Sequence, residues 1–193
     1  MNADASLEYV NRKGQRYYLC ETKTRTGKPR YVFSREIVDR PVPSVPAGYE
    51  IYESANGVVS LRRAGSCQIR EKEVAAVRSV LARYPELAGC RVDSRKCEIV
   101  IYEPPNLGFD HDWLPALLPA GDSALRLIAR NVHMSPVLRF ILDDKQGRTF
   151  RVQRWCYRGS IDGWLTIAGR GPIDELANRY VRHIGRDSFF DLM

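Results

Sequence analysis

The sequence lacks the features that would assign a function class at once. Its 193 residues contain no paired-cysteine zinc motif, no HExxH sequence and no complete phosphate-binding glycine loop. No stretch approaches the roughly 18 consecutive apolar residues that a membrane-spanning helix needs, and the first 15 residues contain no apolar signal segment. We therefore expect no membrane partner, no bound metal and no cofactor.

The cysteines are too few and too scattered for a disulfide framework. Their number is odd and no secretion signal precedes them, so we expect free thiols and a cytoplasmic location. The five are Cys20, Cys67, Cys90, Cys97 and Cys156. Cys90 and Cys97 flank a predicted turn at 93–96 and could face each other, but we expect them to be free and half-buried.

Charge and composition favour a folded protein with an acidic partner. A content of 44% hydrophobic and 10% aromatic residues is enough for a buried core. The net charge of +7 favours nucleic acid or an acidic protein as a partner. The excess is spread along the chain, because residues 1–66 carry 11 basic and 7 acidic side chains and residues 67–193 carry 19 and 16.

The first third of the chain predicts β-hairpins. Short aromatic and β-branched runs at 16–20, 30–34, 49–53 and 58–62 are separated by Gly, Pro and Asn. Three prolines within residues 40–48 predict an extended link between the two hairpins. Asn56-Gly57 predicts a type I′ turn, in which both residues have positive φ.

The remainder mixes helices with further hairpins. Apolar residues at helical spacing predict helices over 69–84 and 172–184, with Gly169 to Pro172 as the approach to the second. Further strands are expected at 90–93, 97–102, 137–142, 148–155 and 164–167, and residues 109–136 are not assigned. The predicted class is α+β: a β-hairpin-rich N-terminal unit of residues 1–65, then an α+β domain of residues 66–193 whose antiparallel sheet is packed by two amphipathic helices.

The stretch TKTRTGKPRY at residues 22–31 holds the densest positive charge of the N-terminal part. Because Pro29 lacks an N–H, a four-residue loop of residues 26–29 is expected, with Arg25 opposite Arg30. This register places aromatic side chains on one face of the hairpin and basic ones on the other. Like charges directly opposite each other are unfavourable, so we expect an anion or solvent to offset the charges of Arg25 and Arg30.

Two interpretations of this hairpin stay open. Basic side chains on a two-stranded ribbon can track a phosphate backbone, and nearby tyrosines can stack on bases. The plainer interpretation is a charged, solvated hairpin tip, with the tyrosines in a small core. The anion-binding candidates are Lys23, Arg25, Lys28 and Arg30, and the stacking candidates are Tyr17, Tyr18 and Tyr31.

One other stretch combines groups capable of chemistry. Asp110, His111 and Asp112 could form an acid–base pair or contact a metal, although either aspartate would equally serve as a helix N-cap. Cys156, between aromatic residues in a predicted strand, is expected to be buried rather than catalytic. We therefore expect a non-enzymatic binding protein for nucleic acid or another polyanion. The alternatives are a protein-interaction or assembly module that uses the prolines of 41–46 and the aromatic strands, and then an enzyme built on the Asp-His-Asp loop.

Overall fold

The computed structural model describes residues 6–105, 131–158 and 161–192. The chain divides into two compact units, which we call unit 1 (residues 1–66 and 118–131) and unit 2 (residues 67–117 and 132–193). Both are built largely from antiparallel strands, and the described helices belong to unit 2. The predicted α+β class is therefore confirmed. No helix in the described ranges is long and apolar enough to cross a membrane.

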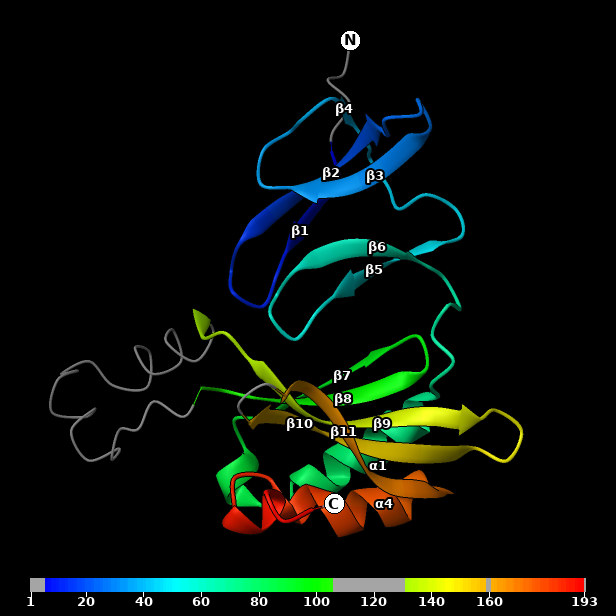
Figure 1. Cartoon of the computed structure of the whole chain (residues 1–193). Helices are drawn as coiled ribbons and strands as arrows, with labels where there is room; N and C mark the ends of the chain where they lie inside the picture. Colours follow the sequence, from blue (N-terminus) through cyan, green and yellow to red (C-terminus); the bar gives the residue numbers. More distant parts are fainter. Residues whose placement is uncertain (1–5, 106–130, 159–160, 193) are drawn as a thin grey trace, which may run out of the picture. The chain divides into compact units, whose positions relative to one another are not determined.

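Unit 1 contains two small antiparallel sheets (Figure 1). The first has the order β1-β2-β3 with β4 also paired to β2, and the second pairs β5 with β6. Their strands are β1 (Glu8–Val10), β2 (Arg16–Lys23), β3 (Pro29–Ser34), β4 (Arg40–Pro41), β5 (Tyr49–Glu53) and β6 (Val59–Arg63). Leu19 and Cys20, which point to opposite faces of β2, are both fully buried.

Three hairpin loops of unit 1 share one structure. We call them tip 1 (residues 11–15), tip 2 (residues 24–28) and tip 3 (residues 54–58). In each, the first residue donates its backbone N–H to the carbonyl of the fifth, and the glycine at the fourth position donates to the carbonyl of the first. The side-chain oxygen of the first residue also accepts a hydrogen bond from the amide of the fifth. The sequences are NRKGQ, TRTGK and SANGV.

The glycine sets the geometry of these tips. Gly14, Gly27 and Gly57 have φ of 76°, 78° and 76°, in the left-handed region that other residues adopt at a cost. This is the three-residue hairpin loop in which a turn is followed by a left-handed residue. The predicted type I′ turn at Asn56-Gly57 is therefore wrong, because only Gly57 has a positive φ.

Tips 1 and 3 pack against each other. Asn11 is 2% exposed, and its Nδ2 donates to the carbonyl of Gly57 at 2.6 Å. The guanidinium of Arg12 donates to the carbonyls of Ser54 and Ala55 and pairs with Glu53, whose Oε1 lies 2.7 Å from Nε. Burial raises the pKa of the Glu53 carboxyl, but hydrogen bonds from Arg12 and Tyr9 outweigh it and lower that pKa overall.

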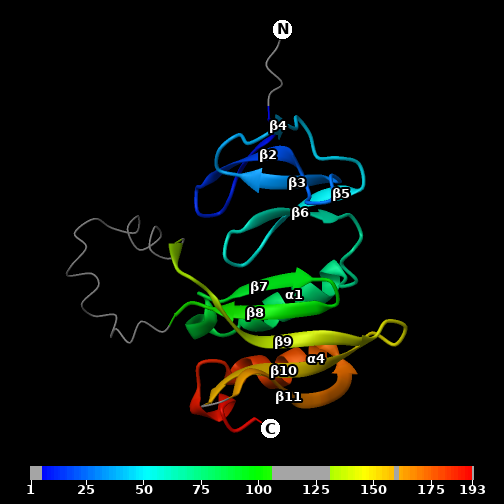
Figure 2. The same ribbon diagram turned by 45° about the horizontal axis from the view of Figure 1, so that its top comes forward.

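The described part of unit 2 is a five-stranded antiparallel sheet with two helices on one face (Figures 1 and 2). The sheet order is β11-β10-β9-β8-β7. Its strands are β7 (Arg91–Arg95), β8 (Glu98–Glu103), β9 (Ser135–Asp144), β10 (Thr149–Arg158) and β11 (Ile161–Pro172), and its helices are α1 (Glu71–Leu81) and α4 (Ile173–Tyr180) with the 3-10 turns η1 (Pro85–Leu87), η2 (Val181–His183) and η3 (Asp187–Phe189).

The core of unit 2 lies between the helices and the sheet. Val77 from α1, Ala177 from α4 and Phe140 and Phe150 from the sheet are all fully buried in one apolar cluster. All four expected helix boundaries move inward, since the helices are Glu71–Leu81 and Ile173–Tyr180 in place of 69–84 and 172–184. The segment from Gly169 to Pro172 belongs to β11, in which Gly171 and Pro172 pair with β10, and the second helix becomes 3-10 after Tyr180.

The turn between β7 and β8 also differs from the prediction. Arg95 pairs with Glu98, so the turn falls at Lys96 and Cys97, and Lys96 takes the positive φ of 54°. Cys90 and Cys97 consequently do not face each other, and all five cysteines are free. Burial, with a smaller contribution from Glu103, raises the pKa of the Cys90 thiol to about 11, so this thiol is protonated at neutral pH.

The tips offer a matched test of glycine. A Cβ added to Gly27 meets open space, whereas one added to Gly57 lies 3.1 Å from Nδ2 of Asn11 and 3.3 Å from Cγ of Lys13. We expect Gly27→Ala to destabilise unit 1 by about 1 kcal/mol, through the positive φ alone, and Gly57→Ala by about 2–3 kcal/mol. Hydrogen exchange of the β2 amides measures both, and equal effects would contradict the packing of tip 1 on tip 3.

Candidate functional site

Tip 2 is held by its own hydrogen bonds. The N–H of Thr24 donates to the carbonyl of Lys28 at 2.8 Å, and the N–H of Gly27 donates to the carbonyl of Thr24 at 2.9 Å. The Thr24 hydroxyl accepts from the amide of Lys28 at 3.1 Å and lies 3.1 Å from the hydroxyl of Thr26. The backbone of the tip is thus fixed without help from another element.

Tip 2 and the strand ends beside it carry the four basic candidates. Lys23, Arg25, Lys28 and Arg30 are all exposed. Within the part of the chain that the structure describes, none of their side chains pairs with a carboxylate. The four cations therefore face solvent, Arg25 and Lys28 on the hydrogen-bonded loop and Lys23 and Arg30 on the adjoining strand ends.

The predicted register of this hairpin is wrong by three residues. Arg30 pairs with Thr22 and Lys23 with Pro29, while Arg25 lies in the loop, so Arg25 and Arg30 are not opposite each other. The prediction starts the loop at Thr26, whereas the left-handed position at Gly27 requires it to start at Arg25. Because the shift is odd, it exchanges the faces. Lys23 lies on the face of Tyr31 and Arg30 on the face of Val32, and no purely basic face exists in this hairpin.

The three tyrosine candidates are half-buried and divided between the two faces of the sheet. Tyr17 and Tyr31 share a face with the fully buried Leu19, and Tyr18 lies on the other. The ring of Tyr31 packs edge-on against Tyr49, with centroids 6.0 Å apart. Tyr31 is the nearest of the three to tip 2 along the hairpin, and base stacking by these side chains stays a prediction.

The Asp-His-Asp candidate, Asp110, His111 and Asp112, lies outside the described residues. Among the residues that are described, no group of three or more Cys, His, Asp or Glu side chains could hold a metal ion. Cys156 is buried in β10, as the alternation of that strand predicts.

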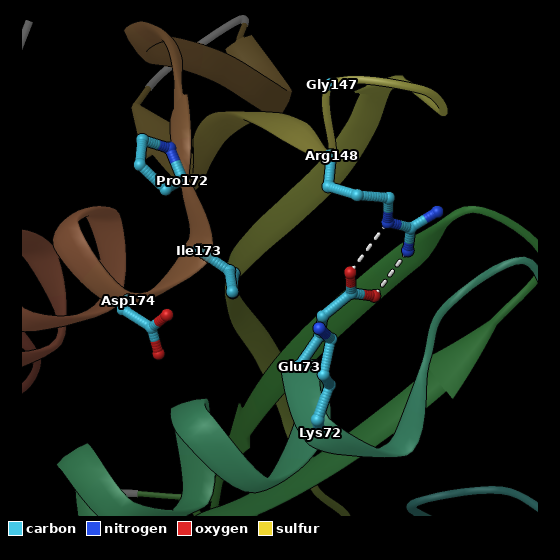
Figure 3. A pocket seen from close by; sticks show the side chains of 7 residues that line it. All are labelled: Lys72, Glu73, Gly147, Arg148, Pro172, Ile173 and Asp174. Carbon is cyan, nitrogen blue, oxygen red and sulfur yellow. Dashed lines mark hydrogen bonds and ion pairs between the residues drawn. The ribbon is translucent and has the colours of Figure 1, made fainter.

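Unit 2 contains a pocket that the sequence did not predict (Figure 3). It has a volume of about 380 Å³ and lies where the first turns of α1 and α4 meet the loop between β9 and β10. Its lining is Lys72, Glu73, Gly147, Arg148, Pro172, Ile173 and Asp174.

A closed ion pair dominates this pocket. Nε of Arg148 lies 2.7 Å from Oε1 of Glu73, and Nη2 lies 2.5 Å from Oε2, so the contact is bidentate (Figure 3). Oε2 also accepts the amide N–H of Arg70 at the start of α1. Burial raises the pKa of Glu73, but the bonds from Arg148 and Arg70 outweigh this and hold the pKa below its usual range.

This geometry supports a structural role rather than a catalytic one. The Glu73 side chain is 4% exposed and already makes three hydrogen bonds, so it has little capacity to act on a ligand. The other charged groups of the lining, Lys72 and Asp174, are exposed. The lining includes no Ser, Cys, His or Tyr side chain that could serve as a nucleophile or proton carrier. The pair ties α1 to the loop before β10.

Sequence reasoning missed two features, for different reasons. The ion pair joins residues 75 positions apart, and no local pattern marks it. The tips do carry a local signal, a residue with a side-chain oxygen three positions before a glycine, which occurs at Asn11, Thr24 and Ser54. Comparing the three would have placed tip 2 in its observed register.

Comparisons with known proteins add no relative. No protein family, curated protein sequence or solved structure matches this chain.

The ion pair predicts a pH-dependent loss of stability in a variant. At neutral pH we expect Glu73→Gln to lower the free energy of unfolding of unit 2 by about 2–3 kcal/mol, because Arg148 loses its buried partner. The folded pKa of Glu73 is lowered, so the stabilisation is complete above the unfolded value near 4.5 and is lost as the pH falls through the folded pKa. The difference between wild type and variant should therefore shrink in acid.

Urea unfolding followed by tryptophan fluorescence measures this effect, because all three tryptophans lie after residue 66. Glu71→Gln is the matched control, since Glu71 lies on the same helix with a side chain 81% exposed and pairs with the exposed Arg78. A loss of stability in Glu73→Gln no larger than in this control would show that the pair does not stabilise unit 2.

Proposed function

We propose that the protein binds the phosphate backbone of nucleic acid through tip 2 and its flanking cations. The supporting observation is a difference among three tips that share one backbone structure. Tips 1 and 3 hydrogen-bond to each other, through Asn11, Arg12 and the carbonyl of Gly57. Among the described residues, the side chains of tip 2 make no hydrogen bond to another tip, and tip 2 carries the most exposed positive charge of the three.

The charge distribution of unit 1 supports the same proposal. Three of its carboxylates are paired with arginines elsewhere in the unit. The pairs are Glu8 with Arg16, Glu50 with Arg62 and Glu53 with Arg12. The unpaired positive charge of the unit therefore includes the side chains of tip 2. A polyanion bound there would neutralise this charge and release its own counterions.

The chemistry of tip 2 suits phosphate. Lys and Arg side chains, the hydroxyls of Thr24 and Thr26, and nearby backbone amides are the groups that contact phosphate oxygens in nucleic-acid complexes. The tip offers no Asn, Gln or carboxylate side chain for reading adenine or cytosine, although Arg and Lys can also read guanine. We therefore expect strong salt dependence, with any sequence preference directed to guanine.

The test is fluorescence anisotropy with labelled single-stranded and duplex DNA and RNA across a series of salt concentrations. We expect the variant with Lys23, Arg25, Lys28 and Arg30 all changed to Ala to bind at least ten-fold more weakly than wild type. On duplex DNA, the slope of log K against log salt should become shallower by about 0.9 for every phosphate that the variant no longer neutralises.

The control removes four exposed cations from other places: Arg35, Arg63, Lys72 and Lys145 changed to Ala. Equally weakened binding in the two variants would mean that binding follows net charge alone, and would overturn the assignment to tip 2. Binding to an acidic protein but to no nucleic acid would reassign the partner.

A protein-interaction role is the second candidate. It is favoured by Ile37 and Val38, which are 55% and 41% exposed in the loop that leads to β4 and the proline-rich stretch. If this loop is an assembly surface, sedimentation velocity should show self-association that increases with concentration and disappears in the variant Ile37→Ser with Val38→Ser. A monomer at all concentrations, in wild type and variant alike, would remove self-assembly through this loop.

A further inference from the structure

Unit 2 carries a second concentration of arginines, at the ends of α1 and α4. Arg83 follows α1, Arg179 lies in the last turn of α4, Arg182 lies in η2 and Arg186 follows it. All four are exposed. Arg179 and Arg182 lie three positions apart at the end of α4 and in η2, whereas Arg186 follows the end of the helical segment at Ile184 and Gly185.

Side-chain contacts connect two of these arginines to neighbouring elements. Nη1 of Arg83 donates to Oδ1 of Asn178 at 2.8 Å, which connects the end of α1 to α4. Arg186 lies over the ring of Tyr84, 5.9 Å from its centroid, and pairs with Glu86 at 2.7 Å. We call Arg83, Arg179, Arg182 and Arg186 the arginine surface.

This surface is incompletely neutralised. Arg186 has a carboxylate partner, but Arg83, Arg179 and Arg182 pair with none in the described ranges. Nε of Arg182 instead donates to Nε2 of His183 at 3.3 Å, while Nδ1 of this histidine lies 2.9 Å from the hydroxyl of Ser188. An arginine that donates to an imidazole requires that imidazole to be unprotonated at the accepting nitrogen.

The pKa of His183 responds to the positive charge around it. Burial lowers its pKa, and the charges of Arg182 and Arg186 lower it further. A bound polyanion would offset the two arginine charges and make the imidazolium easier to form. The histidine is thus a probe of occupancy, and its other polar neighbour is the hydroxyl of Ser188.

We propose that the arginine surface of unit 2 is a second contact for the nucleic-acid backbone. The inference rests on the proposed function of tip 2, and it extends that function to a ligand held by both units. Arginine suits phosphate, which it can bind through two parallel hydrogen bonds. Two contacts on one strand raise the apparent affinity, because binding at one makes the other intramolecular.

The sharpest variant is Arg179→Gln with Arg182→Gln, because neither side chain has a carboxylate partner among the described residues and both are exposed. The matched control is Lys72→Gln with Lys145→Gln, which removes the same charge from exposed positions elsewhere in unit 2. Full-length protein is titrated into a short and a long labelled single-stranded RNA at several salt concentrations, and tryptophan fluorescence checks that each variant is folded.

We expect the arginine variant to bind the long RNA at least five-fold more weakly than the control does. Its salt slope should be shallower by about 1.4, since two phosphates of a single strand are no longer neutralised. The penalty should be smaller for an RNA too short to reach both units. In wild type, NMR titration of the His183 imidazole should show its pKa rising when RNA is present. Equal affinities of the arginine variant and the lysine control would overturn the inference.

The experiment separates this inference from the proposed function. Weakened binding in the tip 2 variant together with wild-type affinity in the arginine variant would retain tip 2 and reject the arginine surface. The reverse result would reject tip 2 and leave unit 2 as the binding unit. An unchanged His183 pKa in saturating RNA would also reject the surface, whatever the affinities.

Discussion

The strand register of unit 1 depends on where the backbone takes a positive φ. Only glycine adopts this conformation without cost, so Gly14, Gly27 and Gly57 determine where each hairpin turns. The turn then fixes which residues pair, and pairing decides which side chains are buried. In β2 and β3 this chain of causes puts Leu19 opposite Phe33. Moving the glycine by one position toward the C-terminus within the same loop would shift every partner by two residues, so that Leu19 would lie opposite Arg35 in place of Phe33.

Prediction from sequence succeeded where a signal is local and periodic. The helix at Glu71–Leu81 follows from the spacing of Val74, Val77 and Val80, and most strands follow from their aromatic and β-branched runs, whereas the short β1 and β4 were not predicted. The hairpin register failed because the prediction gave Pro29 more weight than Gly27. A missing N–H can be tolerated at the end of an edge pairing, but a left-handed residue cannot be moved.

The candidate sites also differ in whether a local sequence pattern predicts them. Lys23, Arg25, Lys28 and Arg30 were recognisable from the sequence because they are close together in it, even though their faces were assigned wrongly. The arginine surface was not recognisable, since Arg83 joins α4 through Asn178 across 95 positions of sequence. The same holds for Glu73 and Arg148. Contacts between distant segments arise from the tertiary fold, and a single sequence contains no record of them.

The contact between tips 1 and 3 has a consequence for the order of folding. Asn11 and Gly57 are 46 residues apart, while the two strands of each hairpin are neighbours in sequence. Hairpins close in microseconds, and distant contacts form later because a long loop must close first. During synthesis the first hairpin emerges with the amide of Asn11 still hydrated. That amide reaches its buried partner only after the third tip has left the ribosome, so the first hairpin waits for the last one to complete its packing.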